Sequence, residues 1–451
     1  MSGVDRGRIA ELMDREQSRF ADAHPESKRL HDRAKDSLLD GVPMNWMTRW
    51  PGAFPVFVES AQGADVTDVD GNTYADLCLG DTGAMTGHSP PATVEAVRAR
   101  VAKGITAMLP TEDALHVGEE MRRRFDMPNW QFSLSATDAN RFVVRIAREI
   151  TGRPKILVHN HCYHGSVDET ITTLVDGQVR LREGNVGAPV DPAETTRIVE
   201  INDLEALERE LSHGDVACVL VEPALTNIGI VLADEGYHEA LRDLTRETGT
   251  FLVIDETHTL CCGPGGYTGV AGLEPDFLTM GKAIGGGIPI GAYGFTEEIG
   301  RRVIDHTVPV AADVGGVGGT LAGNALSLAA ARATLTEVLT EDAFERMIAL
   351  GERFETAVSA TIAEHSLPWS ITRLGCRAEY MFSPSPPRTG GEAAAALDED
   401  LDALLHLYML NRGILLTPFH MMALMSPATT EAHVDRHSEA FAEAAAELID
   451  A

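Results

Sequence analysis

Lys282 differs from the other lysines of this chain in its surroundings. Lysine occurs five times, and Lys28, Lys35, Lys103 and Lys155 lie in charged or helix-edge stretches typical of solvated side chains. Lys282 instead follows an apolar run and precedes a cluster of glycines. An amine in a confined, partly apolar place loses proton affinity and becomes a competent nucleophile toward an aldehyde. The local sequence alone fits a structural lysine equally well.

A carboxylate ends a neighbouring apolar run. Residues 251–254 indicate a buried strand that stops at Asp255 and Glu256. Ligands of open α/β sheets bind at the carboxyl ends of strands, where Asp255 falls. Pyridoxal phosphate (PLP) requires a carboxylate there, because an ionised partner keeps its pyridine nitrogen protonated. A single acid at a strand end is also a common helix cap, but the combination with Lys282 is much more specific.

A third motif suits a phosphate group. Ser135, Ala136 and Thr137 follow the apolar run 131–134 and precede a helix expected to begin at about Asp138. Backbone N–H groups at a helix start, together with hydroxyls, bind phosphate. An ordinary helix cap explains the same residues.

Two ring side chains complete the set of candidates. Tyr163 follows the apolar run 156–159, and Gly165 next to it leaves room for a ring stacked on the tyrosine. A core tyrosine is the alternative. His258 lies close to Asp255 in sequence and is either a partner of the site residues or a packed, hydrogen-bonded histidine.

The elements that position these residues indicate an α/β fold. Between about 130 and 295, apolar runs alternate with segments of helical period, which predicts a mostly parallel sheet covered on both faces. The runs are 131–135, 156–159, 196–201, 217–222, 251–255 and 277–280. Longer helices follow residue 320. We expect a large domain over 60–320, and a smaller α+β domain formed by 1–59 and 321–451.

Composition narrows the class of protein. In 451 residues the acidic side chains exceed the basic ones by 68 − 37 = 31, which disfavours nucleic acid and anionic membranes as partners. No apolar run reaches the ~18 residues that span a bilayer, and residues 1–20 lack the core of a signal peptide, so we expect a cytoplasmic enzyme. Six cysteines without a C-x-x-C pair indicate reduced thiols and no metal site.

The four motifs together resemble those of class III (subgroup II, fold-type I) PLP-dependent aminotransferases. The resemblance covers residues 40–445 and points to the branch that contains glutamate-1-semialdehyde aminomutases and β-phenylalanine transaminases. Its most specific stretches are V-E-P-A-L-T-N-I-G (221–229), D-E-T-H-T (255–259), G-K-A-I-G-G-G-I-P-I-G-A-Y-G (281–294) and G-G-T-L-A-G-N-A-L-S (318–327).

The resemblance implies a role for each matching position. Lys282 would carry PLP as a Schiff base and move the proton, while Asp255 would pair with the pyridine nitrogen. The remaining implied contacts are Tyr163 and Thr257 on the two ring faces, Asn227 at the phenolic oxygen, Ser135, Ala136 and Thr137 at the phosphate, and Thr320 at the phosphate of a neighbouring subunit. A homodimer with shared sites is therefore implied. The cradle departs from the usual S-G-T-E-A, because Ala136 replaces Gly and Asp138 replaces Glu.

The substrate segments depart further. Where related β-phenylalanine transaminases carry an arginine that clamps the substrate carboxylate, this chain has Phe419 or His420. In the N-terminal pocket segment only Arg49 could substitute, and Trp46 and Trp50 together with Phe419 would form an aromatic pocket. Asp81 stands where semialdehyde aminomutases usually carry serine, and would face a substrate amine or cap a turn.

These departures predict a transaminase that moves an amino group between an amine, or a non-α amino acid, and a keto or aldehyde acceptor. The alternative is a glutamate-1-semialdehyde-type aminomutase or an amino-acid epimerase, which would use the same Lys282 and Asp255. A non-catalytic PLP-fold protein is disfavoured because both residues are in place. Family likeness alone disfavours a decarboxylase or aldolase.

Overall fold

The computed structural model describes residues 3–307 and 316–449, and the chain divides into two compact units. Unit 1 comprises Met1–Pro90, Glu345–Pro386 and Ala396–Ala451, and unit 2 comprises Pro91–Phe344 and Pro387–Ala395. The sequence places the divisions at 59/60 and 320/321 instead. Residues 60–90 belong to unit 1 because their strands pair with β15 (Ile414–Leu415). Residues 321–344 belong to unit 2 because α10 (Ala325–Ala333) packs against α3 (Pro91–Val101) and α4 (Glu112–Phe125).

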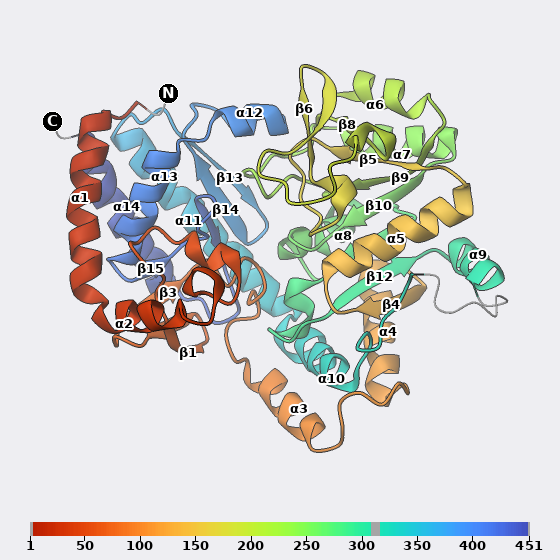
Figure 1. Cartoon of the computed structure of the whole chain (residues 1–451), viewed down its shortest axis with the longest axis horizontal. Helices are drawn as coiled ribbons and strands as arrows, with labels where there is room; N and C mark the ends of the chain where they lie inside the picture. The colour runs from red at the N-terminus through yellow and green to blue at the C-terminus, as the bar shows by residue number, and fades with distance from the viewer. Residues whose placement is uncertain (1–2, 308–315, 450–451) are drawn as a thin grey trace. The chain divides into compact units, whose positions relative to one another are not determined.

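Seven strands form the sheet of unit 2 (Figure 1). Their order is β4 (Asn129–Ser133), β12 (Gly291–Phe295), β11 (Phe277–Met280), β10 (Phe251–Asp255), β9 (Val216–Val221), β5 (Lys155–His159) and β8 (Thr196–Val199). β12 runs antiparallel to both of its neighbours, and the pairs from β11 to β8 are parallel. The residues of β9 and β11 are all buried, as expected for strands covered on both faces. The predicted α/β fold with a mostly parallel sheet is confirmed.

Helix α5 (Ala136–Thr151) crosses one face of this sheet and packs against β9, β11 and β12 (Figure 1). Ser135 caps its start by accepting the N–H of Asp138, and Gly152 ends it at a φ of 67°. The helix thus begins two residues before the predicted Asp138. The other helices and strands of unit 2 are α6 (Leu204–Leu211), α7 (Tyr237–Thr248), α8 (Gly266–Ala271), α9 (Glu297–Thr307), α12 (Gly390–Ala395), β6 (Thr172–Val175) and β7 (Gln178–Leu181).

Unit 1 combines two small sheets with long helices. β1 (Val58–Gln62), β2 (Asp65–Asp68) and β3 (Thr73–Asp76) form an antiparallel meander that β15 extends, and a turn at Asp70 and Gly71 joins β2 to β3. The second sheet has the order β13 (Ser370–Leu374), β14 (Arg377–Met381) and β16 (Met422–Leu424). The helices are α1 (Arg6–Ala23), α2 (Pro25–Ala34), α11 (Glu341–Glu364, which begins in unit 2), α13 (Glu399–Leu410) and α14 (Glu431–Ile449).

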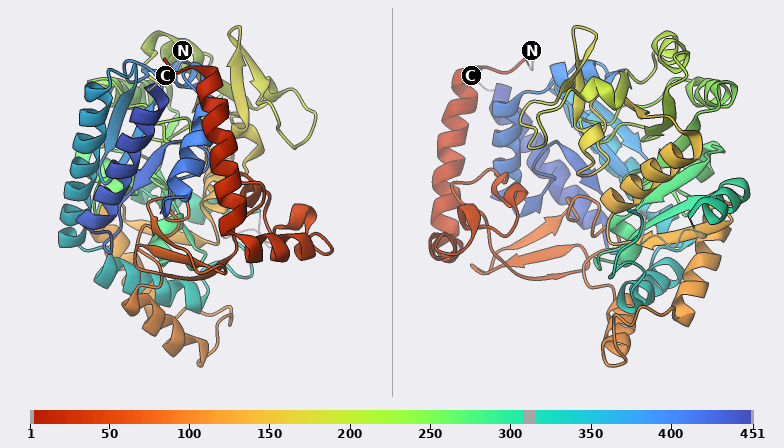
Figure 2. Two further views of the ribbon diagram at one scale, coloured as in Figure 1. Left: turned by 90° about the vertical axis from the view of Figure 1, so that its left-hand side faces the viewer. Right: turned by 45° about the vertical axis from the view of Figure 1, so that its right-hand side comes forward.

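Helix α1 packs along α13, and α13 contacts α14 (Figure 2). One cluster at this packing joins Phe20 of α1 to Leu407 and Leu410 of α13, with Phe54 and Tyr74 beside them. Buried aromatic and leucine side chains of this kind contribute about 1.5–3 kcal/mol each to folding. Unit 1 therefore holds a hydrophobic core of its own.

All six cysteines are buried. Burial raises the pKa of the Cys78 thiol in unit 1 and of the Cys218 thiol in unit 2, each to about 12. Within residues 3–307 and 316–449, no helix has the length and apolar character that a membrane crossing needs. The same residues contain no group of three or more His, Cys, Asp or Glu side chains arranged to hold a metal ion.

Candidate active site

Adjacent parallel strands bring Lys282 and Asp255 to one edge of the sheet of unit 2. Asp255 is the last residue of β10, and its Cα pairs with that of Thr279 in β11. The chain leaves β11 at Met280, so that Lys282 begins the short helix η6 (Lys282–Gly285) with a φ of 49°. Apolar runs of matching register thus place an amine and a carboxylate at the same sheet edge.

The Asp255 carboxylate is buried, with 3% of its surface exposed, and both of its oxygens accept hydrogen bonds. Oδ2 accepts from Asn140 Nδ2 at 2.8 Å and has His164 Nδ1 at 2.9 Å. Oδ1 accepts from the backbone N–H of Thr257 at 3.0 Å and from its hydroxyl at 2.6 Å. Asn140 is itself oriented, because its Oδ1 accepts the Thr279 hydroxyl at 2.6 Å. The carboxylate is therefore fixed by groups from three elements.

Charge favours the ionised form of Asp255. Burial opposes ionisation, but the hydrogen bond and charge of His164, with Thr257 and Asn140, hold the pKa of Asp255 below its usual value. For His164, burial lowers the pKa, whereas the Cys162 sulfur and the Asp255 carboxylate together raise it well above the ordinary value. A buried imidazolium–carboxylate pair results, with a permanent negative charge at the end of β10.

A second series of hydrogen bonds includes Lys282 itself. Lys282 Nζ lies 2.5 Å from Nε2 of His258, and Nδ1 of His258 lies 2.7 Å from the Thr226 hydroxyl. That hydroxyl donates to Oε2 of Glu222 at 2.5 Å, and Oε1 of Glu222 accepts the backbone N–H of Tyr163 at 3.0 Å. His258, Thr226 and Glu222 are all buried. His258, which the sequence leaves between two interpretations, is thus a direct partner of Lys282.

The start of α5 lies beside this group. A Cβ built on Gly281 would be 2.9 Å from the backbone N of Ala136, and one on Gly165 would be 2.0 Å from Oγ1 of Thr137. Glycine at both positions lets backbone approach the first turn of the helix closely. The Thr137 hydroxyl accepts the N–H of Ser166 at 3.2 Å, and the Ser135 hydroxyl caps the helix, so the structure shows the ordinary capping role for Ser135.

The other predicted cofactor contacts lie in unit 2. Tyr163 is half-buried in the loop after β5, and Asn227 is half-buried in the loop after β9, one residue beyond Thr226. Thr320 is exposed in the segment before α10. These three roles stay predictions, as do those of Ser135, Ala136, Thr137 and Thr257.

The residues predicted for the substrate lie in unit 1. Trp46, in the short helix η2 (Asn45–Thr48), meets Phe419 edge to face with ring centroids 5.6 Å apart. Arg49 is exposed directly after this helix, and Trp50 packs against the buried cluster of Phe20 and Phe54. The aromatic pair is present, whereas Trp50 belongs to the core of unit 1. Binding of a substrate by these residues stays a prediction.

His420 and Asp81, which were also predicted to contact the substrate, belong to one group of interacting charged side chains. His420 Nδ1 lies 2.8 Å from Oε1 of Glu379. Burial lowers the pKa of His420, but the charges of Glu379 and Asp81 raise it above the ordinary value. The side chain of Arg377 in β14 is fully buried, its charge acts on His420, and it donates to the Thr82 hydroxyl. Asp81 itself adopts a φ of 49° in a turn after β3.

Sequence reasoning missed Asn140, His164, Thr226 and Glu222 as members of the site. Asn140 and His164 stand inside motifs that were recognised, and the helical period of 138–150 places Asn140 on the buried face of α5. Glu222 and Thr226 stand inside the recognised stretch 221–229, and the available signal was their polarity at and beyond the end of a wholly buried strand, because buried polar groups need partners.

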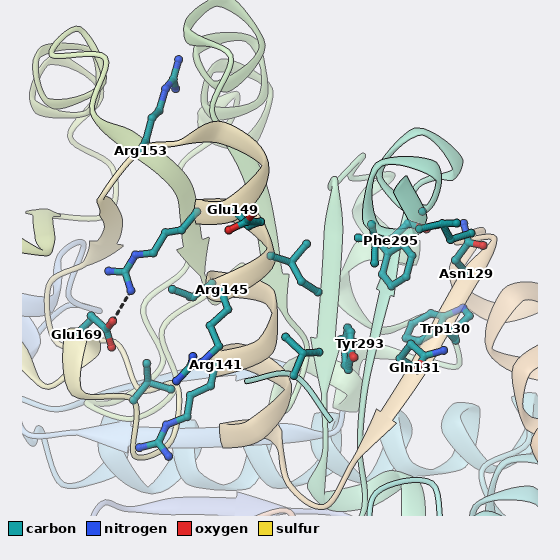
Figure 3. Close-up of a pocket in the computed structure, with 18 of the residues that line it drawn as sticks. Asn129, Trp130, Gln131, Arg141, Arg145, Glu149, Arg153, Glu169, Tyr293 and Phe295 are labelled. Carbon is teal, nitrogen blue, oxygen red and sulfur yellow. Dashed lines mark hydrogen bonds and ion pairs between the residues drawn. The ribbon is translucent and has the colours of Figure 1, made fainter. Parts of the chain in front are cut away.

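A cavity of about 1540 Å³ lies along the outer side of α5, bordered by β4, β12 and α9 (Figure 3). Its lining includes Arg141 and Arg145, which Figure 3 shows projecting from α5, and the ion pair of Arg148 with Glu169 at 2.5 Å. None of the predicted site residues lines this cavity. Its position gives it no part in the Lys282–Asp255 group.

The residues of unit 2 fit PLP. A lysine amine, an ionised buried carboxylate and an uncrowded helix start are the groups needed for an aldehyde, a pyridine nitrogen and a phosphate, respectively. Gly165 and Gly281 support this fit to PLP, because a Cβ at either position would collide with the first turn of α5.

Comparisons with known proteins agree with this chemistry. The model of the class III aminotransferase family matches residues 46–444. Glutamate-1-semialdehyde 2,1-aminomutase of Anaeromyxobacter dehalogenans is 32% identical over 432 residues, covering 93% of this chain and 98% of that protein. A glutamate-1-semialdehyde-aminomutase variant from Pseudomonas aeruginosa PAO1, solved in complex with PMP, has a TM-score of 0.98 at 49% identity, covering 99% of this chain and 100% of that one.

A more distant solved structure is also similar. A β-phenylalanine aminotransferase from Variovorax paradoxus has a TM-score of 0.86 at 26% identity, over 96% of this chain and 97% of that one. The resemblance seen in the sequence is confirmed, including the branch. The chain belongs to the class III aminotransferase family, whose cofactor is pyridoxal phosphate.

Proposed function

We propose that this protein is a PLP-dependent aminomutase, which moves an amino group between two carbons of one substrate. The main observation behind PLP chemistry is that Lys282 and an ionised, buried Asp255 lie at the ends of two adjacent parallel strands. The aminomutase reaction is supported by the 49% identity, over 99% of the chain, to a protein described as glutamate-1-semialdehyde-aminomutase. This revises the order expected from the sequence, in which a transaminase came first.

The proposal gives each residue a task. Lys282 would hold PLP covalently, and Asp255 would pair with its pyridine nitrogen. The first turn of α5 with Ser135, Ala136 and Thr137 would receive the phosphate, and Tyr163, Thr257 and Asn227 would contact the ring. When bound, PLP supplies a conjugated acceptor for the electron pair left on a substrate carbon after a proton is removed.

Asp255 serves by remaining charged. His164 and Asn140 donate to one of its oxygens and Thr257 to the other, so its negative charge persists in a buried place. Lys282 would serve as the base that takes up and returns the substrate proton, because an amine at this position is a base of suitable reach. Both tasks depend on side chains that the sheet edge already holds in place.

A dimer is the second part of the proposal. Thr320 is exposed in unit 2, as a residue that reaches the phosphate in a neighbouring subunit must be. Sedimentation analysis and mixing of two inactive variants test it. Recovery of activity from Lys282→Ala mixed with Thr320→Ala supports shared sites, and an active monomer contradicts them.

A transaminase is the second candidate. It is supported by the edge-to-face pair of Trp46 and Phe419 and by 26% identity to a β-phenylalanine aminotransferase. An aromatic pair of this kind suits an apolar amine, in contrast to a dicarboxylic substrate clamped by arginine.

One experiment separates the two candidates, because an isomerisation requires no second substrate. The purified holoprotein is given glutamate 1-semialdehyde alone, and the position of the amino group is followed by mass spectrometry. We expect turnover to the isomer with the amino group on carbon 1, abolished in Lys282→Ala. In parallel, 1-phenylethylamine and β-phenylalanine are tested with and without a keto acid. Turnover only in the presence of the keto acid, and none of the semialdehyde, would replace the aminomutase by the transaminase.

A further inference from the structure

The polarity of the hydrogen-bonded chain from Lys282 to Glu222 depends on the ionisation of Glu222. The backbone N–H of Tyr163 can only donate, so Oε1 of Glu222 is an acceptor. Burial raises the pKa of Glu222 above its ordinary value, although the charge of His164 and the hydrogen bonds from Thr226 and Tyr163 act in the opposite direction. With Glu222 ionised, the Thr226 hydroxyl donates its only hydrogen to Oε2 and must accept from Nδ1–H of His258. Nε2 of His258 is then left without hydrogen and accepts from Lys282 Nζ at 2.5 Å.

This polarity determines where the amine can react. A neutral amine has one lone pair, and an N–H held by Nε2 of His258 turns that lone pair away from the imidazole. His258 is 5% exposed and follows Asp255 by three residues, so the imidazole is held by the same strand end as the carboxylate. A group that fixes a nucleophile in this way raises the fraction of productive encounters.

We propose that His258 is a positioning residue, which holds the Nζ of Lys282 through one accepted hydrogen bond so that its lone pair faces the carbon under attack. This inference rests on the proposed function, because it concerns the same lysine. The step it serves is the attack of Nζ on an aldehyde carbon. A C=N bond forms, the amine gives up its two hydrogens, and the aldehyde oxygen leaves with them as water.

Titratable groups from several elements surround the hydrogen bonds that link Lys282 to Glu222. Lys282 belongs to η6, and Glu222 to the loop after β9, where it also experiences the charges of His164 and Asp255. Cys261 and Cys262 lie in η5 (Thr259–Cys262), which begins directly after His258. The test is therefore made at one fixed pH for all variants.

The experiment measures how the full-length apoprotein forms its covalent link with added PLP. Rapid mixing at increasing PLP concentration gives two quantities from the absorbance change, namely the dissociation constant of the first complex and the limiting rate of the covalent step. The variants are His258→Leu, which removes the acceptor, His258→Gln, which restores one, and Thr226→Val, which disconnects the imidazole from Glu222. His116→Gln, at a partly exposed histidine of α4, is the matched control.

We expect His258→Leu to lower the limiting rate about tenfold with an unchanged dissociation constant, since a hydrogen bond to an amine is lost but no cofactor contact is. His258→Gln recovers the rate to within about threefold, and Thr226→Val lowers it by about threefold. His116→Gln matches the wild type. If His258→Leu does not fold, Thr226→Val decides by the same two quantities.

Two results overturn the inference. One is an unchanged limiting rate in His258→Leu or, where that variant does not fold, in Thr226→Val. The other is a fall of rate and affinity together that His258→Gln does not recover, which would mark a purely structural histidine. Failure of the proposed function gives a different result. If Lys282 does not bind PLP, wild type and Lys282→Ala would both form no covalent link, and if the protein is a transaminase, the semialdehyde assay fails while the rates of link formation keep the same order among the variants.

Discussion

Gly165→Ala should damage the start of α5 through two separable costs. Its φ of +77° is unfavourable for alanine by about 1–2 kcal/mol. The new Cβ would also lie 2.0 Å from Oγ1 and 2.9 Å from Cβ of Thr137. Relief requires Thr137 to move, which adds about 1–3 kcal/mol of overpacking. The free energy of unfolding should therefore fall by about 2–5 kcal/mol.

Two other glycines separate the costs, because both border the same helix. Gly152→Ala at the end of α5 has a φ of +67° and no atom within 4 Å of the new Cβ, so it isolates the backbone cost. Gly291→Ala has no positive φ but places its Cβ 2.3 Å from the backbone oxygen of Ser135, so it isolates the collision.

Urea unfolding and titration with PLP give the two responses. We expect Gly165→Ala and Gly291→Ala to weaken PLP binding, whereas Gly152→Ala weakens only stability, by about 1–2 kcal/mol. A Gly165→Ala protein that is as stable as Gly152→Ala and binds PLP like wild type would refute the assignment of this helix start to the phosphate.

Three further predictions concern the carboxylate. Asp255→Asn leaves His164 in a buried place without its partner charge, so the free energy of unfolding should fall by about 3–5 kcal/mol in urea titrations, and a loss below about 1 kcal/mol would contradict the buried pair. Thr257→Val keeps the shape but removes the 2.6 Å hydrogen bond to the carboxylate, and should cost about 1.5–3 kcal/mol by the same measurement, against no loss if the hydroxyl is idle. Folding raises the pKa of His164, so its contribution to the free energy of unfolding is complete below the unfolded pKa of about 6.5 and is lost as pH rises through the raised value. Folding lowers the pKa of Asp255, so its contribution is present above the unfolded pKa of about 3.9 and is lost as pH falls through the lowered value. The stability difference between wild type and His164→Gln should therefore shrink on the alkaline side, and a difference independent of pH would exclude the ion pair.

The strands that carry the site were predictable because each is a continuous apolar run. The predicted 251–255 and 277–280 coincide with β10 and β11, and with them the positions of Asp255 and Lys282. β12 was not predicted, because Gly-Ala-Tyr-Gly-Phe has the composition of a loop and becomes a strand only between β4 and β11. Local propensity cannot indicate a strand whose stability comes from its neighbours.

Side-chain partnerships across the chain were less accessible. Lys282 and His258 are 24 residues apart, and Asn140 is 115 residues from Asp255, so their contacts depend on how loops close over the sheet edge. The sequence could indicate that buried polar side chains would need partners, but the choice of partner is a property of the folded chain.

The buried cysteines make the protein its own reporter of unfolding. A thiol whose pKa is raised to about 12 is almost entirely protonated at neutral pH, and the thiolate is the form that reacts with alkylating reagents. Cys78 and Cys218 should therefore be silent in the native protein and react only when their surroundings open. Since one lies in each unit, mass spectrometry of the two alkylated peptides over time would show which unit opens first.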